Sequence, residues 1–354
     1  MKLIKPSFEI FEQGPGLQGI YEAIERAGRT CYKSQAKYQY RNPHTDEVYA
    51  PDFVGTWKVD DDRIGVTTTA EDFYRKEGIF IKESSTAKGF VDRMITSQHY
   101  AMLEHGTVYL KVPVYDANCI DFPHGALDGV THSPYSKVNH EPAPELEDLI
   151  DWTGRTISTE CMYITTNYRV LVENDALCLL EYLCEPTELH EKRVTVRFTT
   201  SNGIMREFTR HRSHSFAVES TRYCNYSKDK FSNEITFVQP SWCTRDYTRE
   251  PIPSNKWLID HLPAEDETGE KQFLSGLLRT ESCYMNLILA GRKPQEARDI
   301  LPLATKCDMV MTGFVSDWQH FFDLRARGTT GAPHPDAKAL AEPLMHEFEK
   351  RQLI

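Results

Sequence analysis

The stretch Val194–Arg212 reads VTVRFTTSNGIMREFTRHR, and the rest of the chain can be interpreted outward from it. Its first seven residues, Val194–Thr200, alternate apolar and polar side chains, which predicts a strand with one buried face. The dipeptide Asn202-Gly203 marks a turn, and Ile204–His211 is predicted to begin a helix. A strand, a turn and a helix would deliver the closing Arg-His-Arg from a rigid scaffold, which suits a ligand site.

The helix leads into a cationic cluster, Arg210–Tyr223, in a chain whose net charge is -11. Arg206 adds a further cation one helical turn upstream, whereas Glu207 and Glu219 are the only acidic residues close in sequence. Gathering cations in a partly buried place costs several kcal/mol unless they are paired. Two interpretations follow. One is an anionic ligand such as a phosphate, whose geometry the arginine fork matches, and the other is an internal ion-pair network.

The same cluster does not favour a metal site or a serine nucleophile. His211 and His214 stand three residues apart, but the neighbouring cations oppose a divalent ion, so no metal site is predicted. Ser220 has no G-x-S-x-G elbow around it, so it is interpreted as a hydrogen-bond donor to phosphate rather than a nucleophile. No G-x-x-x-x-G-K-[ST] P-loop is present.

Composition bounds the class of protein. The chain has 354 residues, 40% of them hydrophobic and 26% charged, which is typical of a soluble globular protein. Its pI near 5.7 disfavours a nucleic-acid or oligonucleotide-phosphate binding module. Nine scattered cysteines without paired spacing indicate reduced intracellular thiols. With no apolar signal core or membrane-length apolar run, we expect a cytoplasmic protein without membrane or nucleic-acid partners.

The expected fold is α+β, a mostly antiparallel twisted sheet flanked by helices, in a single domain over residues 1–354. Helices are predicted at 16–29, 85–97, 176–183, 267–291, 293–299, 307–327 and 335–351. Further strands are predicted at 2–10, at 108–112 before Pro113, at 168–172 and at 235–238. Polar or irregular stretches at 35–76, 113–190 and 240–266 are predicted to be insertions.

Arg210-His211-Arg212 followed after seven residues by Ser220 resembles the R-H-R-x7-S signature of flavin-dependent thymidylate synthases. Three further stretches are similar to motifs of this family, in the same order. His99 with Glu104-His105 resembles G-H-x-x-x-x-E-H, with Gln98 in place of the glycine. The others are Ala297-Arg298-Asp299-Ile300-Leu301-Pro302, similar to A-R-x-x-L-P, and Phe321-Phe322-Asp323-Leu324-Arg325, similar to F-L-x-L-R.

The resemblance implies a homotetramer that holds FAD at its subunit interfaces. It implies the reductive methylation of dUMP to dTMP, with methylenetetrahydrofolate as carbon donor and NADPH as reductant. The implied substrate-binding residues are Arg210, Ser220, Arg222, Arg298 and Arg325, and the implied catalytic set is Arg325, Ser220 and His99. Arg325 would lie beside the uracil and favour ionisation at N3. The implied cofactor-binding residues are His99, His211, Arg212, Glu219 and His320.

The sequence departs from the family pattern at places that serve the flavin. Ala217-Val218 replaces a polar pair, so Glu219 is the expected substitute contact. Phe314-Val315-Ser316 stands where the family has N-x-R, and His320 replaces an asparagine. The alternative function is therefore a nucleotide-binding relative with altered or lost flavin chemistry. Several arginines nevertheless suit dUMP, because hydrogen bonds to a charged phosphate are each worth roughly 1.5–3 kcal/mol.

Overall fold

The computed structural model describes residues 1–41, 48–49, 81–115, 125–142, 149–150, 156–157, 159–262 and 268–354. Its helices are α1 (Gly16–Tyr32), α3 (Ala87–Thr96), α4 (Ala126–Thr131), α5 (Tyr168–Glu173), α6 (Asn202–Phe208), α7 (Asn255–His261), α8 (Glu270–Leu289), α9 (Pro294–Ala297), α10 (Val315–Phe322) and α11 (Pro335–Lys350). Short helical turns are η1 (Tyr100–His105), η2 (Leu177–Tyr182), η3 (Asp229–Phe231), η4 (Arg298–Ile300) and the π-helical η5 (Asp323–Arg327).

The strands are β1 (Lys2–Ile4), β2 (Ser7–Phe11), β3 (Tyr38–Arg41), β4 (Val48–Tyr49), β5 (Ile81–Ser84), β6 (Thr107–Tyr115), β7 (Lys137–Pro142), β8 (Leu149–Ile150), β9 (Thr156–Ile157), β10 (Thr159–Asn167), β11 (Arg193–Ser201), β12 (Ser215–Val218), β13 (Thr236–Val238) and β14 (Lys306–Phe314). All pairings among the described strands are antiparallel except that of β1 with β13. The predicted α+β class with a mostly antiparallel sheet is therefore confirmed.

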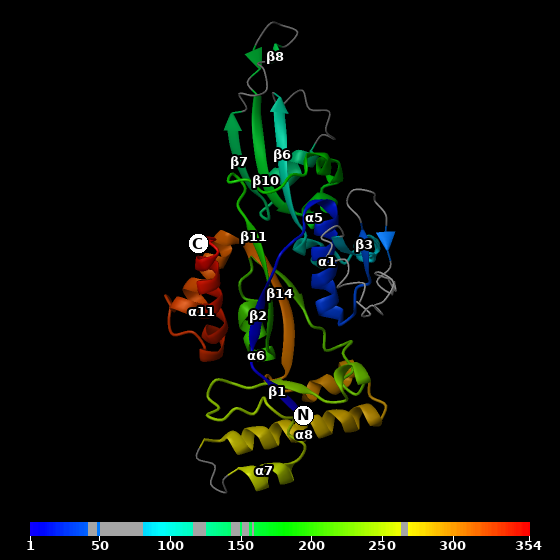
Figure 1. Ribbon diagram of the computed structural model, residues 1–354, viewed down its shortest axis with the longest axis vertical. Coiled ribbons are helices and arrows are strands. Elements are labelled where there is room, and N and C mark those ends of the chain that lie inside the picture. Colours follow the sequence, from blue (N-terminus) through cyan, green and yellow to red (C-terminus); the bar gives the residue numbers. More distant parts are fainter. Residues whose placement is uncertain are drawn as a thin grey trace, which may run out of the picture.

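A four-stranded sheet in the order β12-β14-β11-β2 lies at the centre of the molecule (Figure 1). β11 alternates half-buried and buried residues along its whole length, as the sequence pattern predicted. β14 pairs with β11 over nine residues, from Arg193 opposite Phe314 to Ser201 opposite Lys306. This long antiparallel pair forms the backbone of the region that carries the cationic cluster.

Helices cover both faces of the central sheet. On one face lies α1, which packs with Ala217 of β12 and Val310 of β14 in a common apolar cluster. On the other face α6, α10 and α11 bury a cluster of aromatic rings. Phe198 of β11 lies with its ring centre 5.1 Å from that of Phe208, edge to face. Such aromatic burial dominates core energetics, so this face is the rigid support of the cluster.

Two smaller units lie at opposite ends of the long axis (Figure 1). At one end is the antiparallel sheet β6-β10-β7, whose inner residues join the cluster under α1. At the other end, β1 and β13 pair and lie against α8, where a third cluster includes Leu3, Phe237 and Tyr284. The division of the chain into one domain with three insertions stays a prediction, and most of the 35–76 stretch lies outside the described residues.

Most of the predicted helices and strands are confirmed, and two assignments are wrong. The range 307–327 begins as strand β14 and becomes helical only at Val315. The range 168–172 is helix α5, because the side chain of Asn167 accepts a hydrogen bond from Val170 N at 3.2 Å and so caps a helix start. β6 also runs through Pro113, which is tolerated because β6 is an edge strand.

Candidate functional site

The Arg-His-Arg triplet lies in a pair of tight turns between α6 and β12. α6 starts where Ser201 Oγ accepts from Ile204 N, and the chain leaves the helix through His211 N donating to Phe208 O at 3.1 Å. A second turn, from His214 N to His211 O, starts β12. The turns bury His211 and leave the arginines on either side of it exposed. The cationic side chains are therefore directed outward from a packed base.

Arg325 lies in η5, the π-helical turn after α10, and contacts Glu207 and His211. Its Nη1 donates to Glu207 Oε2 at 2.9 Å, its Nη2 to Glu207 O at 3.0 Å and its Nε to His211 Nε2 at 3.2 Å. Single π-helical turns recur at functional sites. Glu207 thus pairs with Arg325, so the internal ion-pair interpretation holds for this one arginine. Arg206, Arg210 and Arg212 have no ion pair within the described ranges.

The hydrogen bond from Arg325 determines the state of His211. An arginine can only donate, so Nε2 of His211 must be the unprotonated nitrogen of a neutral ring. Burial lowers the pKa of His211 to about 4, with Arg325 and His320 acting in the same direction. The ring of His320 lies with its centre 6.0 Å from that of His211 and is exposed. His211, His320 and Arg325, which the sequence predicted separately, are therefore brought together.

Ser220 lies at the opposite end of β12. The strand is four residues long, about 13 Å at a rise of about 3.3 Å per residue. Ser220 N donates to Cys31 O at 3.1 Å, and Arg298 Nη1 donates to the neighbouring Thr221 Oγ1 at 3.3 Å. Arg222 is exposed. Ser220, Arg222 and Arg298 are thus gathered in one place, which is separate from Arg325.

The C-terminal end of α1 contacts this second place through three consecutive residues. The carbonyl of Cys31 accepts from Ser220 N, as described above. The hydroxyl of Tyr32 is hydrogen-bonded to His99 Nδ1, and its ring centre lies 6.4 Å from that of Tyr223. Lys33 is paired with Glu219. Tyr32 is a residue that the sequence interpretation missed, because its helix is distant in sequence and carries no motif.

Glu219, which was predicted to contact a cofactor, lies in a buried ionic cluster. Its Oε2 accepts from Lys306 Nζ at 2.9 Å and from Asp308 N at 3.0 Å. Its side chain is 2% exposed. The carboxylate of Glu219 is therefore occupied by protein groups, and its contact with a cofactor stays a prediction.

The positions that depart from the family pattern have structural partners. Ala217 is buried under α1, and Val218 packs against the aromatic cluster on the other face of the sheet. Phe314 lies under the guanidinium of Arg193, 5.5 Å from ring centre to Cζ. Ser316 donates from its backbone N to Glu191 Oε1 at 3.1 Å. These side chains stabilise the sheet and the start of α10.

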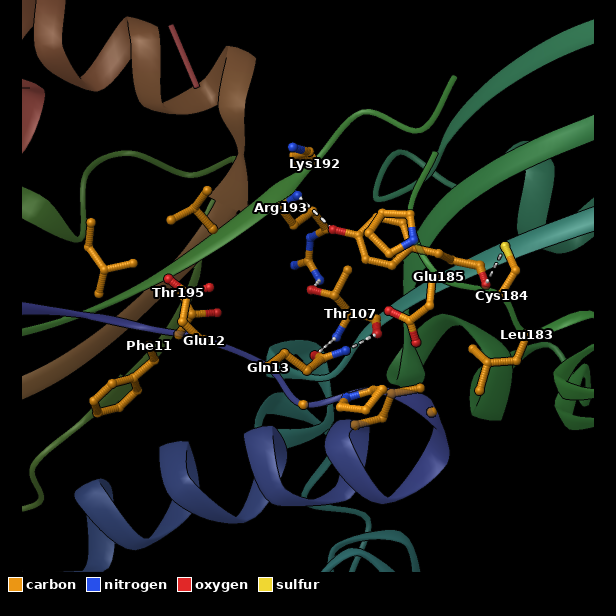
Figure 2. A pocket seen from close by; sticks show the side chains of 18 of the residues that line it. Phe11, Glu12, Gln13, Thr107, Leu183, Cys184, Glu185, Lys192, Arg193 and Thr195 are labelled. Carbon is orange, nitrogen blue, oxygen red and sulfur yellow. Dashed lines mark hydrogen bonds between the residues drawn. The ribbon is translucent and has the colours of Figure 1, made fainter. Parts of the chain in front are cut away.

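A cleft of about 430 Å³ lies elsewhere, between β2, β11 and the segment after η2, and Figure 2 shows it. None of the predicted site residues lines it. Gln13 bridges its floor, donating to Thr107 O at 2.8 Å and accepting from Thr107 N at 2.9 Å. Glu12 is paired with Arg351. Because none of the predicted site residues lines this cleft, we place the candidate site at the two ends of β12.

Among the described residues no three His, Cys, Asp or Glu side chains gather in a way that could hold a metal ion. None of the helices in the described ranges has the length and apolar composition that a bilayer crossing requires.

Comparison with known proteins finds a family match over the C-terminal part of the chain. Residues 185–351 match the model of the family described as thymidylate synthase complementing protein. A probable flavin-dependent thymidylate synthase of Paramecium bursaria Chlorella virus 1 is 28% identical over 161 residues, 44% of this chain and 67% of that protein. The flavin-dependent thymidylate synthase of Haloarcula marismortui is 28% identical over 130 residues, 36% of this chain and 51% of that protein.

Among solved structures, the UMP/dUMP methylase PolB from Streptomyces cacaoi bound with 5-Br dUMP aligns with a TM-score of 0.38 and 12% identity, over 99% of this chain and 93% of that chain. The aligned part of this chain spans about half to two thirds of the curated relatives' length.

Proposed function

We propose that this chain, whose residues 185–351 belong to the thymidylate synthase complementing protein family, is a flavin-dependent thymidylate synthase. The reaction is the reductive methylation of dUMP to dTMP, with methylenetetrahydrofolate as carbon donor and NADPH as reductant. The names of the relatives support the reaction class. The matched range contains every arginine to which the sequence assigned a nucleotide-binding role.

The observation that carries the proposal is the cationic loop at the Ser220 end of β12. Arg222 is exposed beside Thr221, and Arg298 Nη1 donates to Thr221 Oγ1. Neither arginine has a carboxylate within ion-pair distance in the described part of the chain. A phosphate monoester brings a charge of about -1.5 to -2 and three acceptor oxygens. Such a ligand offsets the repulsion between the arginines, so this loop is the proposed seat of the dUMP phosphate. Arg210, at the other end of β12, would reach that phosphate from another subunit.

Arg325 is the proposed partner of the uracil. A guanidinium has five N–H donors, and Glu207 and His211 take three of them. One N–H on Nη1 and one on Nη2 are left for a ligand. A fixed cation with two directed donors favours the anionic form of a neighbouring uracil N3–O4 edge. Because His211 is neutral, it adds no second positive charge that would repel the guanidinium of Arg325.

The Arg-His-Arg end suits an anionic cofactor such as FAD. Arg206 and Arg212 are exposed cations without an ion-pair partner among the described residues, and His214 Nε2 is buried without a hydrogen-bond partner. We propose that His211, Arg212 and His320 hold the cofactor, and that His99, oriented by Tyr32, lies against its ring. FAD bound there would supply the hydride, and the side chains would orient it and exclude water.

The two ends of β12 are about 13 Å apart at the strand rise of about 3.3 Å per residue. No hydrogen bond or ion pair joins Arg325 and His211 to the Ser220 loop in the described residues. We therefore propose a homotetramer in which the Arg-His-Arg end of one subunit completes the Ser220 end of another.

The test is the visible spectrum of the purified protein. A bound flavin gives a yellow protein whose absorbance bleaches with NADPH, and C5-tritiated dUMP should then release tritium. A colourless protein that takes up no added FAD would overturn the proposal. Separate subunits in sedimentation, with full activity, would overturn the tetramer.

A second candidate is a nucleotide-binding relative with altered flavin chemistry. Phe314 and Ser316 favour it, because both positions serve internal contacts with Arg193 and Glu191. Tight dUMP binding without NADPH oxidation would select this candidate over the first.

A further inference from the structure

The ionic cluster under the Ser220 loop has a composition that packing alone does not require. It consists of Lys33, Glu219, Lys306 and Asp308, two cations and two anions whose side chains are at most 19% exposed. Buried ion pairs stabilise a fold little compared with apolar groups of the same size, and their best-supported use is to specify one arrangement. A cluster of this kind therefore points to a particular arrangement of the elements that it joins.

The members of the cluster come from three parts of the site. Lys33 follows α1, Glu219 follows β12 and immediately precedes Ser220, and Lys306 and Asp308 begin β14. Lys306 Nζ donates to Asp308 Oδ2 at 2.5 Å and to Glu219 Oε2 at 2.9 Å, and Lys33 Nζ lies 3.2 Å from Glu219 Oε2. Lys33 also donates to Asp308 Oδ2. Every cation thus bridges both carboxylates.

Backbone hydrogen bonds between Glu219 and Asp308 reinforce these ion pairs. Glu219 N donates to Asp308 O at 2.8 Å, and Asp308 N donates back to Glu219 Oε2 at 3.0 Å. Thr199 Oγ1 of β11 donates to Asp308 Oδ1 at 2.6 Å, so the carboxylate of Asp308 cannot rotate freely. The residue before Ser220 is therefore held by main chain and side chain to the central sheet.

The backbone of Lys33 indicates that its side chain is needed at this position. Lys33 caps α1 with φ +50° and ψ +46°, in the left-handed region. Glycine fills such caps without steric penalty, whereas a lysine is disfavoured there. Strain of this kind persists where the surroundings over-determine the residue. Here the ammonium of Lys33 links α1 to Glu219 and Asp308, which glycine could not do.

We propose that Lys33 and Lys306 are positioning residues that act through Glu219 and Asp308 to hold the Ser220 loop in the geometry that receives the nucleotide phosphate. This inference rests on the proposed function for its ligand, and on the contacts above for its mechanism. Neither lysine touches the nucleotide. Removing one of the two lysines leaves the side chains of Ser220, Arg222 and Arg298 unchanged but makes the backbone of the Ser220 loop less well fixed.

The variant Lys33→Met tests this proposal, because methionine keeps most of the side-chain length and removes the charge. dUMP binding is measured by calorimetry on the flavin-loaded protein, and amide hydrogen exchange is measured at Glu219 and Ser220 without nucleotide. We expect the dUMP Kd to rise about tenfold or more, faster exchange at both amides, an unchanged flavin spectrum and partial recovery in Lys33→Arg.

Glu270→Gln is the matched control, since Glu270 is also buried and bound by Thr244 and Tyr247 but is the first residue of α8. It should lower the melting temperature without changing the dUMP Kd or the two amides. Wild-type Kd and wild-type exchange in Lys33→Met would overturn the inference, as would equal effects in Glu270→Gln. A wild-type protein that binds no dUMP would overturn the proposed function instead, and the exchange rates would still decide the role of Lys33.

Discussion

Arg325 and Glu207 are joined twice, through the carboxylate and through the backbone carbonyl of the same glutamate. The glutamate belongs to α6 and the arginine to η5, so the pair locks the helix before the Arg-His-Arg turn to the π-helical turn after α10. A guanidinium held from two directions has a defined orientation before any substrate arrives. Preorganised charge of this kind supplies much of the rate enhancement of many enzymes.

The first prediction concerns this pair. Glu207→Ala removes one charge-assisted hydrogen bond, worth about 1.5–3 kcal/mol, so turnover should fall by about 12- to 160-fold. Arg325→Ala should lower turnover further while flavin stays bound, because the arginine faces the uracil in the proposed site. Both are measured as dTMP formed per bound flavin. Arg327→Ala, an exposed arginine of the same turn paired with Asp323, serves as control, and an equal loss there would contradict the assigned role.

The second prediction concerns Tyr32. Its hydroxyl is hydrogen-bonded to His99, and that bond orients the imidazole. Tyr32→Phe keeps the ring beside Tyr223 and removes the bond, worth about 0.5–1.5 kcal/mol, so kcat/KM should fall by about 2- to 12-fold. Tyr135→Phe, at an exposed tyrosine, should change nothing. Unaltered kinetics in Tyr32→Phe would show that His99 needs no orienting partner.

The third prediction uses two glycines in opposite surroundings. A Cβ on Gly313 of β14 would lie 2.4 Å from His214 Cδ2, whereas a Cβ on Gly276 of α8 would meet nothing within 4 Å. Gly313→Ala should therefore destabilise the protein by about 1–3 kcal/mol through overpacking. Gly276→Ala should stabilise it by about 0.5–1 kcal/mol, because alanine loses less entropy in a helix. Urea unfolding measures both, and a shared sign would contradict the packing around His214.

The fourth prediction concerns acid sensitivity. Burial lowers the pKa of His105 and of His214 from 6.5 to about 3, and nearby cations add to the effect. Both rings are neutral in the folded protein, so protonation favours the unfolded chain. The stability they contribute is present above pH 6.5 and is lost progressively as the pH falls from 6.5 toward 3.

The slope is about 1.4 kcal/mol per pH unit for each histidine. Urea unfolding across this range measures it. His105→Asn should flatten the dependence, and the exposed His346→Asn should leave it unchanged. A free energy of unfolding that does not vary with pH across the range would contradict the burial of these rings.

Much of the scaffold was predictable because its signals are local. The alternation of Val194–Thr200 specified β11, and the helical spacing in 16–29 and 335–351 specified α1 and α11. β14 was not predictable in this way. Its residues are buried on both faces, so the apolar run has no period of two and resembles a buried helix. Only pairing with β11 and β12, which are remote in sequence, makes it a strand.

The candidate site was predictable as a set of residue types, and less so as an arrangement. Arg325 and His211 are 114 residues apart, and their contact depends on how η5 follows α10. The role of Glu219 could not be foreseen, because its partners Lys33 and Lys306 lie on α1 and β14 and follow no motif. Tyr32 escaped notice for the same reason. Long-range packing supplies these neighbours, and single-sequence patterns do not record it.

The strand β12 has a consequence for the length of the motif itself. Ala217 faces α1 and its neighbours Phe216 and Val218 face the aromatic cluster, so Glu219 continues the alternation toward Lys33. Inserting one residue into β12 would turn the Glu219 carboxylate onto the aromatic face and shift Ser220 by about 3.3 Å. Because side chains alternate between the two faces of β12, the number of residues between Arg212 and Ser220 determines which face the Glu219 side chain lies on. The spacing would tolerate a change of two residues better than a change of one.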